Sequence, residues 1–173
     1  MHKETSMIAK PMNKVARYVF LGLIGTALLL VLVIYLGVPY TGILWTVDLV
    51  FITSALYVYN RHIASEYCYE VASYGGRESF IVSMRVGKTV RTLARLDADA
   101  ITEVRRLTGK EYRDYKCSSG VYKYAYFPTM FPESVYLVSI RSFHEKADVF
   151  IEANEEFAGV LASFIQRHAE DLE

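Results

Sequence analysis

The sequence predicts a membrane α-helical hairpin joined to a mainly β domain of about seven antiparallel strands that ends in an amphipathic helix. Two observations predict this class. Two apolar, nearly uncharged runs, 18–38 and 40–59, follow one another in the first third of the 173-residue chain. After residue 66 they give way to short alternating runs that are typical of strands. We therefore divide the chain into a basic leader (1–17), the hairpin (18–59), a linker (60–66) and a domain (67–173).

Each apolar run is long enough to cross a bilayer. At a rise of about 1.5 Å per residue, roughly 20 helical residues span the hydrocarbon core. The turn between the runs contains Pro39 and no charged residue, and so short a connection makes the two helices antiparallel neighbours. A cleaved signal peptide would have a shorter apolar region and a small-residue cleavage site. The first run therefore favours a membrane span.

Basic residues flank the hairpin on one side only. The outer turn is uncharged, and the residues flanking the two runs on the other side include Lys3, Lys10, Lys14, Arg17 and Arg61. The positive-inside rule then places both ends of the chain in the cytoplasm. The sequence predicts a multi-pass protein of the cell (plasma) membrane with cytoplasmic N- and C-termini. In that compartment Cys68 and Cys117 are expected to be free thiols.

Asp48 is the one ionisable residue within the two runs. It lies roughly 12 Å from the outer turn, where a charge is costly. In one interpretation its carboxyl group is protonated or hydrogen-bonded and faces the other helix, near Thr26, Thr46 or water at the interface. In the other, it works in an ion or proton relay, or holds an oligomer together. Neither run contains a Lys, Arg or His that could pair with it, which favours the first interpretation.

Seven strands are expected in the domain, joined by short connections. Their ranges are 67–73, 79–86, 89–96, 101–107, 120–127, 134–141 and 147–152. The alternative for 101–107 is a short turn of helix. The turns between them include Gly75-Gly76, Gly87-Lys88 and 142–145. In the fifth strand Tyr122, Tyr124 and Tyr126 are expected on one face and Lys123 and Ala125 on the other.

The last helix is predicted from its cap and its periodicity. Asn154 is a good N-cap, and Glu155 and Glu156 complement the positive end of the helix dipole. Apolar residues then recur at spacings of three and four, namely Phe157, Val160, Leu161, Phe164 and Ile165. We expect this face to cover the open end or face of the strands.

This element order, with a hairpin in front, resembles bacterial membrane proteins that carry a pleckstrin-homology-like (bacterial PH) domain. The resemblance also includes the stretch from Val86 to Val104, a hairpin followed by a strand that ends before an I-x-x-V segment. It implies a PH-like barrel of seven strands and a non-catalytic binding or scaffolding module at the membrane. Its partner would be a protein or anionic lipid, with no cofactor. Phosphoinositide binding is not carried over.

Two surfaces are candidates for binding. Arg85, Lys88 and Arg91 surround the Gly87 turn, where cations attract anionic headgroups by about 1 kcal/mol each. The alternative is a solvated face balanced by the interleaved acidic residues. The second surface is the loop from Phe127 to Glu133, where an apolar tip could contact lipid or a partner through Phe127, Met130 and Phe131. The alternative there is ordinary packing of aromatic rings on a strand.

No motif indicates an enzyme, a metal site or a nucleic-acid partner. Lys plus Arg and Asp plus Glu both number 19, and no His and Cys cluster has metal-ligand spacing. A C-x₅-R phosphatase loop starting at Cys117 would need Arg where the chain has Lys123, so a Ser/Gly turn is favoured. The expected function is a membrane-anchored binding module. The alternative is a homo-oligomeric pore or transporter accessory subunit that uses Asp48.

Overall fold

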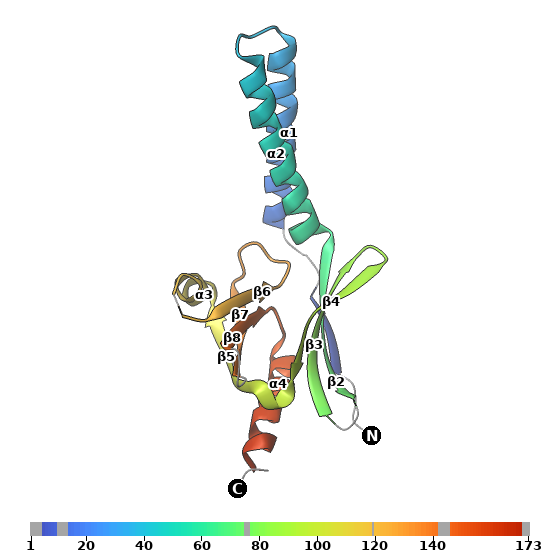
Figure 1. Cartoon of the computed structure of the whole chain (residues 1–173), viewed down its shortest axis with the longest axis vertical. Helices are drawn as coiled ribbons and strands as arrows, with labels where there is room; N and C mark the ends of the chain where they lie inside the picture. Colours follow the sequence, from blue (N-terminus) through green and yellow to red (C-terminus); the bar gives the residue numbers. More distant parts are fainter. Residues whose placement is uncertain (1–4, 10–13, 75–76, 119, 142–145, 171–173) are drawn as a thin grey trace. The chain divides into compact units, whose positions relative to one another are not determined.

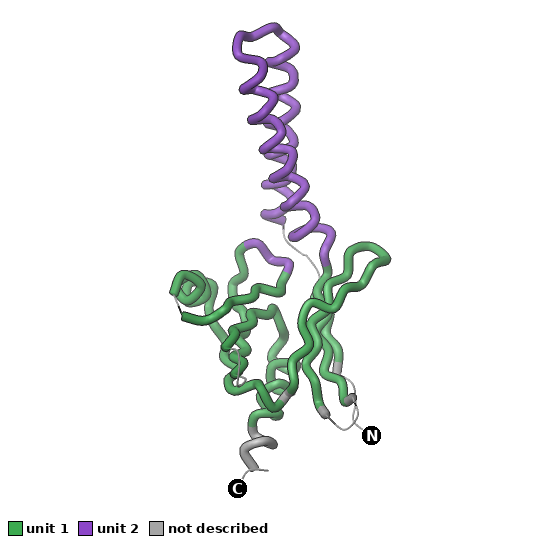
Figure 2. Tube along the Cα trace, in the orientation of Figure 1, with its two compact units in different colours: residues 1–10, 66–127, 131–173 green, residues 11–65, 128–130 purple. Residues whose placement is uncertain are grey.

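The computed structural model describes residues 5–9, 14–74, 77–118, 120–141 and 146–170. The chain forms two compact units, which Figure 2 shows in different colours. The helical unit contains Pro11–Ser65 and Pro128–Met130. The β-rich unit contains Met1–Lys10, Glu66–Phe127 and Phe131–Glu173. The turns expected at Gly75-Gly76 and 142–145 lie outside the described residues.

Two helices that run side by side dominate the helical unit (Figure 1). They are α1 (Lys14–Tyr35) and α2 (Thr41–Val58), and α2 continues into a π-helical turn, η1 (Tyr59–Ile63). Both are long and apolar enough to cross a membrane, as predicted. Only 6% and 17% of their most apolar windows are buried within the chain, so nearly all of this apolar surface is left uncovered.

The two helices meet along a seam with alternating spacings of three and four residues. On α1 the buried and half-buried positions include Ala16, Phe20, Leu23, Ala27, Leu30 and Ile34. On α2 they are Leu44, Asp48, Phe51, Ala55 and Val58, together with Ser54 beside Ala55. This spacing is that of left-handed, coiled-coil-like packing. Asp48 therefore lies in the seam between the helices, on the face that the first interpretation expected.

The β-rich unit contains two four-stranded sheets. The first has the order β1-β2-β3-β4, formed by β1 (Thr5–Ala9), β2 (Ser65–Tyr74), β3 (Arg77–Val86) and β4 (Thr89–Asp97). The second has the order β5-β7-β8-β6, formed by β5 (Ile101–Thr108), β7 (Ser134–Arg141), β8 (Lys146–Ile151) and β6 (Tyr122–Tyr126). The predicted helix-plus-sheet class is confirmed. A short 3₁₀ turn, η2 (Ala98–Ala100), joins the sheets, and a helix that was not expected, α3 (Gly109–Lys116), precedes β6.

The leader contributes a strand that the sequence interpretation missed. Residues Thr5–Ala9 pair antiparallel with β2, from Thr5 opposite Val71 to Ala9 opposite Tyr67. Met7 and Ala9 pack on the core, whereas Ile8, which points the other way, is 45% exposed. The five residues, Thr-Ser-Met-Ile-Ala, do not alternate between polar and apolar, and they lie among lysines, so their pattern does not indicate a strand.

Two hydrophobic cores hold the unit together. The larger lies between the inner faces of the sheets and α4 (Glu155–Glu170), with Tyr69, Phe80, Val138, Phe157 and Leu161 at its centre. The smaller lies on the outer face of the second sheet, under α3, and contains Leu107, Tyr112, Phe127, Val135, Leu137 and Phe150. The N-cap prediction is confirmed, because the Phe157 amide donates to Asn154 Oδ1 at 2.8 Å.

The expected barrel does not close, and not all strands are antiparallel. β6 pairs parallel with β8, from Tyr122 opposite Ala147 to Tyr126 opposite Ile151. β6 is therefore an outer strand of the second sheet, whereas β4 is an outer strand of the first. Tyr69 links the sheets: its hydroxyl donates to the Tyr126 carbonyl oxygen at 2.6 Å and accepts from the Glu152 amide at 3.3 Å.

Candidate functional site

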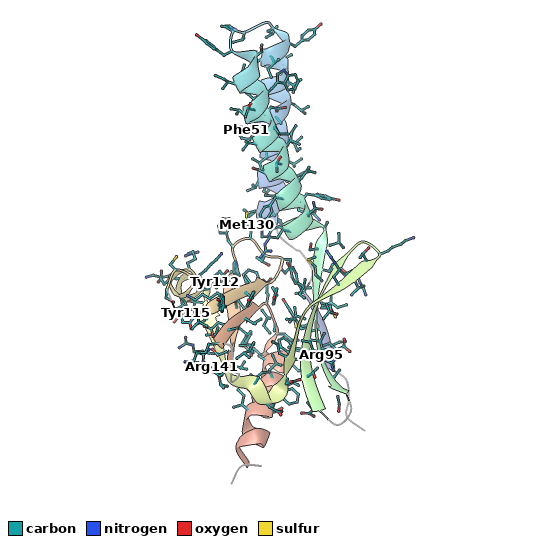
Figure 3. The ribbon with its side chains drawn as sticks, in the orientation of Figure 1. Phe51, Arg95, Tyr112, Tyr115, Met130 and Arg141 are labelled. Atoms are coloured by element: carbon teal, nitrogen blue, oxygen red, sulfur yellow. The ribbon has the colours of Figure 1, made fainter. Side chains whose placement is uncertain are left out.

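A groove of about 430 Å³ lies in the β-rich unit where the sheets fail to close. One wall is the outer strand β4, which contributes residues 93–97. The second sheet provides the rest through Tyr124, Tyr126, Ile140, Ala147 and Val149, with Ala100 at the connection. Figure 3 labels Arg95 on the β4 wall. The groove thus lies between the outer strands of two sheets.

The lining of the groove is mainly apolar. Ile140 and Val149 are part of the larger core and almost fully buried. The rings of Tyr124 and Tyr126 are stacked, with centroids 5.9 Å apart and planes 13° from parallel. Burial raises the pKa of Tyr126, so its hydroxyl group stays neutral and able to donate. The charged side chains of Arg95 and Asp97 are exposed.

A β-bulge shapes the β4 wall. Val82 and Ser83 of β3 are opposite Ala94 and Thr92, so Leu93 is an extra residue in β4. A bulge increases local twist and re-aims side chains, and bulges are common beside binding sites. Here both Leu93 and Ala94 line the groove.

The three cations predicted around the Gly87 turn do not form one cluster. All three are exposed, and Gly87 adopts a left-handed φ of +60° at the turn. However, Arg91 is the cross-strand partner of Met84, and Arg85 is the partner of Val90. Since adjacent residues of a strand point to opposite faces, Arg85 and Arg91 lie on opposite faces of the hairpin. Arg85 instead lies 4.0 Å from the Glu66 carboxylate.

Most of the apolar side chains predicted at the tip of the loop are not fully exposed. Phe127 is only 5% exposed and packs edge-on against Tyr112, with ring centroids 5.5 Å apart. Met130 is half-buried and belongs to the helical unit, where His62 Nδ1 lies 2.6 Å from the Pro128 carbonyl oxygen. Phe131 is 62% exposed. The exposed apolar tip therefore reduces to Phe131.

The carboxyl group of Asp48 is buried, and neither the Thr26 nor the Thr46 hydroxyl donates a hydrogen bond to it. It is 2% exposed, and its Oδ1 atom has no hydrogen-bond partner among the described residues. The Thr26 and Thr46 hydroxyls instead donate to the carbonyl oxygens four residues earlier in their own helices, at 2.9 and 3.1 Å. Threonine in an apolar helix commonly makes this local bond. Asp48 therefore keeps an unpaired oxygen in the seam, which costs free energy away from water.

A buried carboxylate, which the sequence interpretation did not single out, organises the outer face of the second sheet. Asp148 is fully buried and accepts hydrogen bonds from the Tyr115 hydroxyl at 2.7 Å and the Ser139 hydroxyl at 2.9 Å. The Arg141 guanidinium lies 3.5 Å away. The bond to Asp148 raises the pKa of Tyr115. Figure 3 labels Tyr115 and Arg141. Because both carboxylate oxygens of Asp148 accept hydrogen bonds, we assign this residue a structural role.

Helix α3 is held at both ends by side chains. At its start the Thr108 amide and hydroxyl donate to the Glu111 carboxylate, which lowers the pKa of Glu111. At its end the Lys123 ammonium donates to the Tyr115 carbonyl oxygen at 2.6 Å and to the Ser118 hydroxyl at 2.7 Å. A cation there satisfies terminal carbonyl groups of the helix. Lys123, considered above for a phosphatase loop, thus caps α3.

Comparison with known proteins adds no function to this picture. Searches against protein-family models, curated proteins and solved structures found no match. Within the described parts of the chain, no three His, Cys, Asp or Glu side chains gather as a metal site would require. The uncovered apolar helices and the groove are the features of the described residues that bear on function.

Proposed function

We propose that this protein is a membrane-anchored, non-catalytic binding module that presents its β-rich domain to a protein partner at the cytoplasmic face of the cell membrane. The observation that carries the proposal is the uncovered apolar surface of α1 and of the α2–η1 helix. Lipid is the natural cover for such a surface. Anchoring then holds the groove at high local concentration for any partner on the same membrane.

The PH-like character of the domain belongs to this proposal. Its support is the order of elements, since seven strands, β2 to β8, are followed by the amphipathic helix α4. The parallel pairing of β6 with β8 departs from a wholly antiparallel PH-like barrel. A protein partner is preferred to anionic lipid because Arg85 and Arg91 lie on opposite faces of their hairpin.

The proposed orientation can be tested with the protein's own cysteines. Cys117 is exposed, whereas Cys68 is half-buried and burial raises the pKa of its thiol, so Cys117 should react first. We expect a membrane-impermeant maleimide to label the full chain in permeabilised cells but not in intact ones. The Cys117→Ser variant is the control that assigns the label. Labelling of Cys117 in intact cells would contradict a cytoplasmic domain and overturn the proposed function.

Asp48 favours a second candidate, an oligomeric pore or transporter accessory subunit. Its unpaired Oδ1 in the helix seam is the kind of costly intramembrane group that often marks a relay. The test is ion or proton flux into liposomes that contain the full chain, followed with a trapped pH-sensitive or cation-sensitive dye. The binding-module proposal predicts no flux above that of empty liposomes. Flux that Asp48→Asn abolishes would instead support the second candidate.

A further inference from the structure

We propose that the groove binds an extended peptide segment of a partner protein, which adds as a strand to the outer edge of β4. This inference rests on the proposed function and names the chemistry of its partner. The occupant is identified by the groove's walls, its floor and its length.

One wall of the groove is a strand edge. β4 is an outermost strand of its sheet, and among the described strands none pairs with its outer edge. Five consecutive residues of β4, from both faces of the strand, line the groove, whereas β6 lines it only through Tyr124 and Tyr126, which lie on one face. An outer edge presents a row of backbone donors and acceptors that another strand can satisfy. An extended polypeptide carries such groups on both of its sides, whereas an acyl chain carries none.

The floor of the groove suits alternating side chains. Leu96, Ala147 and Val149 make it apolar, and Tyr124 and Tyr126 provide a stacked aromatic side. In a strand, every second side chain would point to this floor and the others to water. We therefore expect a segment with apolar residues at alternate positions and without proline, as in other complexes formed by strand addition.

The length of the segment follows from the β4 wall. The lining residues 93–97 form a continuous stretch of one strand. At about 3.3 Å per residue this stretch is roughly 16 Å long, which matches a bound core of about five residues. A heptapeptide is therefore long enough to fill the groove and to extend beyond it at both ends.

The test uses the full chain in lipid nanodiscs and a displayed library of random heptapeptides. We expect selection to enrich proline-free peptides with apolar residues at alternate positions. Placing proline at the centre of an enriched peptide should weaken its binding at least tenfold, because proline lacks the donor and disrupts strand pairing. The absence of enrichment, or equal binding of the proline peptide, would overturn the proposal.

Matched variants place the binding in the groove. Ala147→Trp should fill the floor and weaken binding of the enriched peptide at least tenfold. Tyr124→Ala, at a half-exposed position that tolerates change, should weaken it about fivefold. Tyr122→Ala is the control, since Tyr122 precedes them on the same strand and face, is 71% exposed and does not line the groove. The affinity of the Tyr122→Ala variant for the enriched peptide should stay within twofold of that of the unaltered chain.

Two further outcomes would assign the groove to another occupant and overturn the proposal. One is a peptide whose binding neither Ala147→Trp nor Tyr124→Ala changes. The other is displacement of the enriched peptide by a soluble fatty acid that binds the unaltered chain but not Ala147→Trp. Either result would leave the orientation found by Cys117 labelling unchanged. Failure of this inference is thus distinguishable from failure of the proposed function.

Discussion

Replacement of Asp148 by alanine is expected to lower the free energy of unfolding of the β-rich unit by about 3–4 kcal/mol. The carboxylate is fully buried and is the shared acceptor of the Tyr115 and Ser139 hydroxyls, so its removal leaves a buried and a half-buried donor unsatisfied. Arg141 loses its partner as well, although its side chain is partly exposed and can turn to water. Thermal unfolding of the full chain in detergent micelles, followed by circular dichroism, should show a midpoint lowered by roughly 10 °C.

Asp114→Ala is the matched control for this prediction. Asp114 is an exposed carboxylate on α3, and its loss should change stability by at most about 0.5 kcal/mol. Tyr115→Phe should give an intermediate loss of about 1 kcal/mol, because it removes one of the hydrogen bonds to Asp148. If the midpoint of Asp148→Ala differed from that of the unaltered chain by no more than the midpoint of Asp114→Ala does, the carboxylate would not hold these strands and α3 together.

Gly109→Ala is expected to destabilise the β-rich unit by about 2–3 kcal/mol. A methyl group at this position would overlap the Pro132 carbonyl oxygen, which belongs to the backbone and cannot rotate away as a side chain does. The Gly109 amide also donates to the Glu133 carbonyl oxygen at 2.7 Å, so relieving the overlap would strain this bond. The same unfolding measurement should show a midpoint lowered by roughly 8 °C or more.

Gly159→Ala in α4 provides a control of opposite sign. Apart from its chain neighbours and the backbone of α4 itself, no atom of the described residues lies within 4 Å of a Cβ added there. Alanine is favoured over glycine inside a helix by about 1 kcal/mol. We therefore expect the midpoint of this variant to rise. If Gly109→Ala were as stable as the unaltered chain, Gly109 could not pack as closely against the Pro132 carbonyl oxygen as the structure shows.

Elements with strong local patterns were predictable from the sequence. The apolar runs anticipated α1 and α2, and the predicted range 134–141 coincides with β7. Asn154 was identified as the cap of α4, and its side chain accepts the Phe157 amide. The alternation in the fifth strand also holds, since Tyr124 and Tyr126 line the groove while Lys123 contacts α3. The spacing of apolar residues and the capping of helices depend on residues that are close in the sequence, so both can be predicted from it.

Some short local elements were missed. Helix α3 begins with a capping box, Thr108 and Glu111, a signal that the sequence contains but that the sequence interpretation did not single out. β1 is five residues long, lies within the basic leader and has no alternation of polar and apolar residues. Short elements such as these have weak patterns of their own. Their partners stabilise them: β2 in the case of β1, and the core residues around Tyr112 in the case of α3.

The sequence by itself determined which segments are helices of membrane length, where seven of the strands lie and where the last helix begins, because these depend on local periodicity and charge. Only the tertiary structure decided how the strands pair. It added β1 to the first sheet, placed β6 parallel to β8, left β4 as an outer strand beside a groove, and separated Arg85 from Arg91. It also buried Asp148 among donors and left Asp48 with an unpaired oxygen. Register and edge exposure depend on contacts between residues far apart in the chain, which local patterns do not record.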